Sequence, residues 1–413
     1  MSNLAIRGGT PLRNDPWPTW PPYTEREREF LNLVLDSRNW GGYPSPNFQA
    51  RHFAEEYAKY AGAKYGICAA NGTVTLEIAL RALGIAAGDE VIVPATSWVA
   101  TAACAVYLNA VPVFVDIKPM NFTIDCDLIE AAITPKTRAI IAVHLGSTIA
   151  DLDRLTEIAK KHGLALIEDC AHMHGGEWRG RGVGSIGDLG SFSFQSSKLM
   201  TAGEGGLILT SDPVLEQKCQ SLVNCGRKEP GYDEFDGRLF GWNYRISEFQ
   251  AAVLRAQLEA LPERTKLRAE NGAYLTEQLR KIPGIGVIER DPRITTQAHY
   301  QFIFTYDKNE FAGVHRDKFI EACEAEGLHL DGAFYKPMYA NSLFAAKTGE
   351  WPMLRERYGD GITKESANTP VAWEFALETG VWMHYPKLMG TKKDVDDIVA
   401  IIRKVRENAT ELR

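Results

Sequence analysis

Short apolar runs alternate with amphipathic stretches along the first half of the chain. The strand-like runs cover residues 65–70, 89–94, 112–116, 139–144, 165–169, 190–194 and 206–210. Helical spacing of apolar residues covers 25–36, 46–60, 76–83, 98–108, 127–133, 151–162 and 213–222. Continuously apolar strands separated by helices are typical of βαβ units. The pattern therefore predicts an α/β fold with a mainly parallel sheet and helices on both of its faces.

The pattern changes after a long helical stretch over residues 247–282. Pro262 lies inside this stretch, where we expect a kink or break because proline has no amide hydrogen to donate. Beyond it, residues 299–305 alternate like a strand. A short strand at 381–385 and helices at 316–327 and 391–408 complete the C-terminal pattern. This part of the chain is typical of a smaller α+β unit.

The first 25 residues form a third kind of region. They are rich in proline, with Trp17 and Trp20 among the prolines, which predicts an irregular arm that packs through its aromatic rings. We therefore expect an N-terminal arm (1–25), a large α/β domain (26–262) and a small C-terminal α+β domain (263–413).

Composition narrows the class of protein. Lysine and arginine number 46 against 53 acidic residues, for a net charge of −7, and no basic run occurs, which disfavours nucleic acid or an anionic membrane as the main partner. The seven cysteines are scattered without a C-x-x-C pair, as in a reducing compartment. The N-terminus lacks an apolar signal core, and no stretch approaches the roughly 20 apolar residues of a membrane span. We expect a cytoplasmic protein.

Lys198 is the most informative single residue. It stands among serines between a strand-like run and four closely spaced turn residues, with Phe194, Leu199 and Met200 close to it in the sequence. Burial disfavours the charged form of an amine, so a buried lysine can act as a nucleophile toward carbonyl groups. The sequence favours Lys198 as the anchor of pyridoxal phosphate, held as a Schiff base, over a structural lysine beside a turn.

Polar residues at the ends of two other strands suit a phosphorylated aromatic ligand, because ligands of open α/β sheets bind at the carboxyl ends of the strands. Asn71, Gly72 and Thr73 open a helix, whose free amides could hold a phosphate. An ordinary helix cap is the alternative for this motif. Trp98 begins a helix after another strand and could stack on a flat ring, or be a core residue.

Asp169 ends the strand at 165–169 and could pair with a protonated ring nitrogen. A metal site is the alternative, because Glu168, His172 and His174 lie close by in the sequence. Neighbouring residues of a strand point to opposite faces, however, so Glu168 and Asp169 would not converge on one ion. We predict no metal.

Together these motifs resemble the sugar-aminotransferase family of fold-type-I pyridoxal-phosphate enzymes (DegT/DnrJ/StrS type). The similarity extends over nearly the whole chain. The matching stretches are Gly8-Gly-Thr-Pro-Leu-Arg13, Asn71-Gly-Thr73, Asp89-Glu-Val-Ile-Val-Pro94, Glu168-Asp-Cys-Ala-His172, Ser191-Phe-Ser-Phe194, Lys198, Thr201-Ala-Gly-Glu-Gly-Gly206 and Gly241-Trp-Asn-Tyr-Arg-Ile-Ser-Glu-Phe-Gln-Ala-Ala252. The nearest branches are glutamine:scyllo-inosose aminotransferases and 3-amino-5-hydroxybenzoate synthases.

The resemblance implies a role for each matching residue. Lys198 would bind the cofactor and carry a proton during the reaction, while Asp169 would pair with the pyridine nitrogen. Trp98 would stack on the ring. His172 stands where the family often has glutamine, near the ring hydroxyl.

The phosphate and the partner subunit complete the implied site. Gly72, Thr73 and Ser193 would bind the phosphate. Asn243 would reach the phosphate of a neighbouring subunit, which implies a homodimer with shared active sites.

The resemblance also implies an aminotransferase that moves an amino group from L-glutamine or L-glutamate to a keto-sugar or cyclitol ketone. Arg245 is a candidate for the donor carboxylate, since guanidinium groups pair bidentately with carboxylates. His144 is a candidate for the substrate wall, where the sequence departs from the family's usual aromatic-glycine pair. An aromatising dehydratase of the 3-amino-5-hydroxybenzoate synthase type is the alternative. A non-catalytic cofactor-binding regulator would need a DNA-binding module, which the sequence does not show.

Overall fold

The computed structural model describes residues 3–344, 351–359 and 361–413. Its largest element is a seven-stranded sheet of order β1-β9-β8-β5-β4-β2-β3, in which β9 runs antiparallel to both of its neighbours and all other pairings are parallel. The strands are β1 (Tyr65–Ala69), β2 (Glu90–Pro94), β3 (Val111–Val115), β4 (Thr137–Val143), β5 (Ala165–Asp169), β8 (Leu189–Ser193) and β9 (Gly206–Thr210). The predicted mainly parallel α/β fold is confirmed.

Helices cover both faces of this sheet, which explains why its strands are apolar throughout. They are α2 (Phe48–Ala61), α3 (Gly72–Ala82), α4 (Ala100–Val106), α5 (Cys126–Ala132), α6 (Leu152–His162) and α7 (Pro213–Val223). Val91 and Val93 of β2 pack in one core with α3, α4 and α7, whereas Ile92 between them packs with α5 and α6. Successive side chains of a strand thus enter two different cores.

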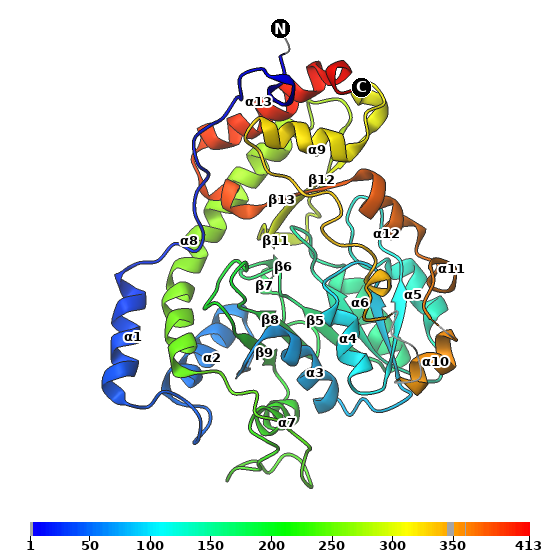
Figure 1. Ribbon diagram of the computed structural model, residues 1–413. Helices are drawn as coiled ribbons and strands as arrows, with labels where there is room; N and C mark the ends of the chain where they lie inside the picture. The colour runs from blue at the N-terminus through cyan, green and yellow to red at the C-terminus, as the bar shows by residue number, and fades with distance from the viewer. Residues whose placement is uncertain (1–2, 345–350, 360) are drawn as a thin grey trace.

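The long helix α8 (Glu248–Leu279) joins the large sheet to the C-terminal part (Figure 1). It passes through Pro262 without ending, so of the kink or break expected there, the break is wrong. The physical reason is packing on both sides of the proline: Leu258 and Leu261 lie in a core of the large sheet, and Leu275 and Leu279 lie in the C-terminal core. Packing of this kind can outweigh the single hydrogen bond that proline removes.

The C-terminal part has its own antiparallel sheet, β10-β12-β13. The elements of this part are β10 (Ile285–Val287), β11 (Ile294–Thr296), β12 (Gln301–Tyr306), α9 (Arg316–Ala325), α10 (Pro352–Tyr358), α11 (Lys364–Ala367), α12 (Pro370–Glu374), β13 (Gly380–His384) and α13 (Lys392–Glu407). Strand β11 pairs with two short strands that come earlier in the chain, β6 (Glu177–Trp178) and β7 (Arg181–Gly182), in a second small sheet of order β11-β6-β7. Met338, Tyr339 and Leu354 instead pack in the core of the large sheet. The C-terminal third therefore contributes to both cores.

The N-terminal arm runs between the two parts of the molecule. In Figure 1 it starts beside α13 and descends to α1 (Glu25–Ser37), which lies along α8. The indole of Trp17 donates to the Gly327 carbonyl at 2.8 Å, and that of Trp20 donates to the Ser196 carbonyl at 3.1 Å. The arm thus packs through its aromatic rings. Among the described residues, no helix has both the length and the apolar character needed to cross a membrane.

Candidate active site

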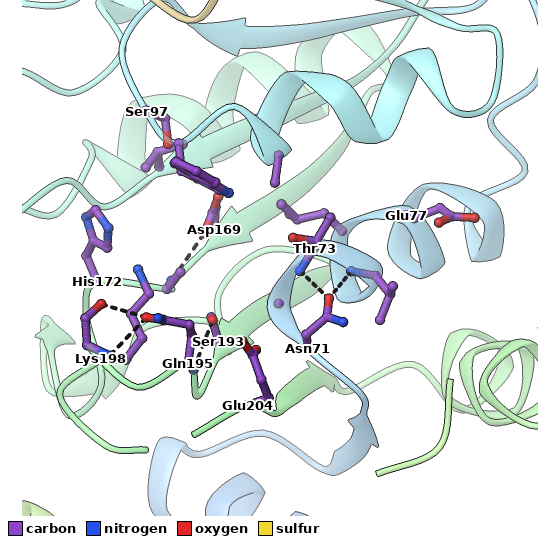
Figure 2. Close-up of a pocket in the computed structure, with 18 of the residues that line it drawn as sticks. Asn71, Thr73, Glu77, Ser97, Asp169, His172, Ser193, Gln195, Lys198 and Glu204 are labelled. Carbon is purple, nitrogen blue, oxygen red and sulfur yellow. Dashed lines mark hydrogen bonds between the residues drawn. The ribbon is translucent and has the colours of Figure 1, made fainter. Parts of the chain in front are cut away.

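A pocket of about 1090 Å³ opens at the carboxyl ends of β5 and β8. Eight residues singled out from the sequence line it, and the first and last are more than a hundred residues apart: Asn71, Gly72, Thr73, Trp98, Asp169, His172, Ser193 and Lys198. Figure 2 shows six of its labelled residues, Asn71, Thr73, Asp169, His172, Ser193 and Lys198, arranged around one space. The parallel topology brings them together, because β5 and β8 end at the same edge of the sheet.

Lys198 lies on the loop between β8 and β9, with 9% of its surface exposed. Its Nζ lies 4.4 Å from the centre of the Tyr300 ring. Burial lowers the pKa of Lys198 to about 8, against the opposing charge of Asp169. The loop is held from outside, since the Tyr385 hydroxyl donates to the Lys198 carbonyl at 3.0 Å. Near neutral pH this amine has an accessible uncharged form, which is the nucleophilic one.

Asp169 is the last residue of β5. Its Oδ2 accepts a hydrogen bond from the Thr101 hydroxyl at 2.8 Å, and its Oδ1 accepts from the Ala171 amide at 3.2 Å. Burial raises the pKa of Asp169, although these two hydrogen bonds oppose the shift. A buried carboxylate of this kind favours a positively charged or proton-bearing partner in the pocket.

The start of α3 forms the polar end of the pocket. The Asn71 side chain accepts from the amides of Thr73 and Val74, both at 3.1 Å, so the cap that the sequence left as an alternative is present (Figure 2). Gly72 lies so close to Ser193 that an added Cβ would stand 2.5 Å from the Ser193 Cβ. Two hydroxyl side chains and a helix N-terminus therefore meet where only glycine fits.

His172 lies between two tyrosines that the sequence reasoning missed. Its ring stacks on Tyr300, with 4.1 Å between the ring centres, and its Nε2 lies 3.2 Å from the Tyr335 hydroxyl. Burial and the charge of Lys198 lower the pKa of His172 well below its usual range, so the imidazole is neutral. Tyr300 and Tyr335 also line the pocket, although both come far after Thr210, where the last strand of the large sheet ends. No local motif marks either residue.

Thr101 is the other residue that the sequence reasoning missed. It lies in α4, one helical turn after Trp98, and its hydroxyl orients the Asp169 carboxylate. The spacing of three residues from Trp98 would have placed it on the same side of a helix. That signal was available in the sequence.

Three predicted site residues lie outside the pocket-lining set. Asn243 is exposed and pairs with Asn224 across an isolated bridge. The Arg245 guanidinium donates to Asn224 Oδ1 at 2.9 Å. His144 is fully buried, with its Nε2 3.1 Å from Glu168 Oε2. The single chain therefore does not bring these three side chains to the pocket.

The residues of the metal alternative do not converge. Glu168 accepts hydrogen bonds from the amides of Gly184, Ile186 and Gly187, on the side of β5 away from Asp169. His174 lies 2.9 Å from the Ser193 carbonyl. Within the described ranges, the one group with ligand atoms close together is His144, Glu168 and Cys170, in which the Glu168 carboxylate already serves these amides.

The geometry agrees with what comparisons with known proteins show. A family model described as the DegT/DnrJ/EryC1/StrS aminotransferase family matches residues 23–403. A Streptoalloteichus tenebrarius protein, provisionally named L-glutamine:3-amino-2,3-dideoxy-scyllo-inosose aminotransferase, is 49% identical over 100% of both chains. A second protein of that organism, L-glutamine:2-deoxy-scyllo-inosose aminotransferase, is 40% identical over 100% of this chain and 99% of its own length.

Solved structures share the fold over nearly the whole chain. The crystal structure of 3-amino-5-hydroxybenzoic acid synthase superposes with a TM-score of 0.83 at 29% identity, covering 97% of this chain and 100% of the other. Sequence and structure therefore agree over almost the full length. The chain is an aminotransferase and belongs to the DegT/DnrJ/EryC1/StrS aminotransferase family.

Proposed function

We propose that this aminotransferase uses pyridoxal phosphate bound to Lys198 to move an amino group from L-glutamine to the ketone of a hydroxylated cyclohexane ring. The full-length relatives at 49% and 40% identity carry names that specify L-glutamine and a scyllo-inosose derivative, and they support this choice of donor and acceptor. The single observation that carries the proposal is the buried Lys198 amine in the same pocket as the Asp169 carboxylate.

The residues of the pocket fit this cofactor. A buried amine with a pKa of about 8 suits capture of an aldehyde. The close approach of Gly72 to Ser193, beside the start of α3, suits a phosphate. When bound, pyridoxal phosphate supplies an aldehyde that takes up the amino group and a ring that withdraws electrons.

Each side chain would then have a defined task. Lys198 would hold the cofactor and, once released from it, carry a proton to and from the substrate carbon. Asp169, oriented by Thr101, would keep a proton on the ring nitrogen. Trp98 would cover one face of the ring. His172 would lie near the ring hydroxyl.

The phosphate would be held by Gly72, Thr73 and Ser193. We further propose a homodimer in which Asn243 reaches the phosphate in the partner's site. In support, Asn243 is exposed, as are Phe240 (80%) and Trp242 (52%) in the same segment. Exposed aromatic side chains of this size are typical of interfaces.

The test uses the purified enzyme loaded with pyridoxal phosphate. Adding L-glutamine should remove the visible absorbance of the lysine-bound cofactor, and adding scyllo-inosose should restore it and yield an aminocyclitol detectable by mass spectrometry. L-glutamate is the matched alternative donor. A spectrum unchanged by both amino acids would contradict the proposal.

An aromatising dehydratase on the same cofactor is the second candidate. The likeness to 3-amino-5-hydroxybenzoic acid synthase supports it, at 29% identity over nearly the whole chain. The higher identity of the aminotransferases favours the first candidate. A product that absorbs in the ultraviolet like a substituted benzoate would decide for the dehydratase.

A further inference from the structure

Two tyrosines from the C-terminal part of the chain line the pocket, Tyr300 and Tyr335. Their hydroxyls lie within hydrogen-bond distance of Ser197 and His172, which also line it. Both rings contact His172, at centre-to-centre distances of 4.1 Å and 5.8 Å. A phenol can donate one hydrogen bond and accept others. The neighbours of each hydroxyl therefore decide which of these capacities is left for a ligand.

The proton of Tyr300 is used within the protein. Ser197 Oγ donates its single proton to Gln195 Oε1 at 2.7 Å, and that oxygen also accepts from the Ser197 amide at 2.9 Å. The Ser197 and Tyr300 oxygens lie 2.8 Å apart. Because the Ser197 proton is already committed, Tyr300 must donate to Ser197. The remaining capacity of the Tyr300 oxygen toward the pocket is that of an acceptor.

The Tyr335 hydroxyl accepts its hydrogen bond within the protein, because the tautomer of His172 determines the direction of the bond between them. The Gly146 amide donates to His172 Nδ1 at 3.4 Å, so this nitrogen carries no proton in the neutral ring. The proton is then on Nε2, 3.2 Å from the Tyr335 oxygen, and His172 is the donor of that bond. Among the described residues, the Tyr335 hydroxyl forms its hydrogen bond with His172. Its proton is therefore available to the pocket.

Burial of the Tyr335 ring keeps that proton in place. Burial raises the pKa of Tyr335 well above its usual range, so the phenol stays protonated at any working pH. Phe334 and Trp382 pack against its ring and limit its movement. A fixed donor and a fixed acceptor thus belong to two residues that line the same cavity.

We propose that Tyr335 and Tyr300 form an oriented pair that recognises two oxygens of the acceptor ring, one accepting from Tyr335 and the other donating to Tyr300. This inference rests on the proposed function, since it takes the acceptor to be a hydroxylated cyclic ketone. The ring of such a ketone offers both kinds of oxygen: a carbonyl that only accepts, and hydroxyls that donate and accept. His172 is then a positioning residue for Tyr335.

The test separates the two halves of the reaction. In Tyr335→Phe, the second half-reaction with scyllo-inosose should lose roughly 10- to 100-fold in kcat/KM, because a substrate oxygen is left without its donor in a buried site. The first half-reaction with L-glutamine should stay within about 2-fold of wild type. Tyr300→Phe should lose roughly 3- to 10-fold with scyllo-inosose, since the ring over Lys198 is kept.

Tyr306→Phe is the matched control. Tyr306 donates to the Val314 carbonyl in the C-terminal core, outside the pocket, so the same chemical change there should leave both half-reactions unaltered. Thermal melting of each variant checks that it is folded.

The direction of the hydrogen bond between His172 and Tyr335 can also be tested through the tautomer of His172. ¹⁵N NMR of histidine-labelled enzyme, assigned with His172→Gln, should show His172 protonated on Nε2. In His172→Gln the ratio of the two half-reaction rates should stay near that of wild type, because the glutamine amide can accept from Gly146 and donate to Tyr335. In His172→Leu kcat/KM for the ketone should fall relative to that for L-glutamine, about as in Tyr335→Phe.

The outcomes are distinguishable. Equal slowing of both half-reactions in Tyr335→Phe, no slowing in either, or a proton on His172 Nδ1 would each overturn the oriented pair while leaving the transaminase intact. A wild-type enzyme that ignores both L-glutamine and L-glutamate would instead overturn the proposed function, and the histidine tautomer would remain readable.

Discussion

Glu168 and Asp169 are neighbours on β5 and both are buried, but they lie in opposite electrostatic environments. Glu168 faces three backbone amides and His144, and these partners, against the cost of burial, lower its pKa. Asp169 faces the pocket with two hydrogen bonds, and burial raises its pKa. The comparison teaches that a buried charge whose partners are all supplied by the protein is structural. One that is incompletely paired and faces a cavity is available for chemistry.

Among changes to these residues and their partners, we expect the largest effect from Lys198, which lines the same pocket as Asp169. Lys198→Ala should lower transamination by on the order of 10⁴-fold, because it removes both the cofactor anchor and the proton carrier. Steady-state rates and the mass of the reduced protein–cofactor adduct would check this. Lys161→Ala, a change at an exposed lysine, should leave both unchanged. Substantial turnover in Lys198→Ala would contradict the assignment.

Asp169→Asn should separate activity from stability. We expect a loss of roughly 10²- to 10³-fold in kcat, because the electrostatic support of the ring nitrogen is removed. The melting temperature of the cofactor-free enzyme should stay the same or rise, since a neutral amide avoids the cost of a buried charge. A strongly destabilised variant would show that Asp169 is structural, like Glu168.

Glu168→Gln should instead lower the stability of the protein. The amide NH₂ would face backbone amide donors, so we expect the free energy of unfolding to fall by about 3 kcal/mol. The melting temperature measures this effect. Glu289→Gln at the surface should change it by less than about 0.5 kcal/mol. A Glu168→Gln variant as stable as wild type would remove the contrast between the two carboxylates.

The smallest effect is in the pH dependence of stability. The lowered pKa of Glu168 means that its contribution is present at neutral pH and is lost as pH falls through that pKa. The raised pKa of Asp169 means that stability falls as pH rises through it. Wild type should therefore melt above Glu168→Gln and no higher than Asp169→Asn at about pH 7, and both gaps should narrow toward about pH 4.

Much of the large sheet could be predicted because its strands are buried on both faces. Residues 165–169 were expected as a strand from their apolar run, and β5 has the same bounds. The described residues between Met338 and Thr379 carried no prediction, because their helices have only three to seven residues each and are too short to show a period. Pro262 misled for a related reason: a local rule does not include the packing of α8 against two cores.

The site residues also fall into those that local patterns predict and those that depend on contacts between distant parts of the chain. Asp169 and Ser193 end neighbouring parallel strands, so topology alone places both at the pocket edge. Tyr300 and Tyr335 enter the pocket from the C-terminal part, and their position depends on contacts across the chain that no local pattern contains. Asn243 came from the resemblance, and its proposed role depends on a second subunit. Arg245 came from the pairing of guanidinium groups with carboxylates, and its side chain donates to Asn224 instead of lining the pocket.

The loop that carries Lys198, between β8 and β9, is held by residues near both ends of the chain. Trp20 donates to the Ser196 carbonyl, and Tyr385 donates to the Lys198 carbonyl. The rings of Trp20 and Tyr385 pack edge to face, with 5.0 Å between their centres. Both hydrogen bonds are accepted by main-chain carbonyl oxygens of the loop and by none of its side chains. Replacing side chains of this loop therefore leaves both of these bonds in place. Removing the N-terminal arm would remove one of them, although none of the arm's described residues (3–25) lines the pocket.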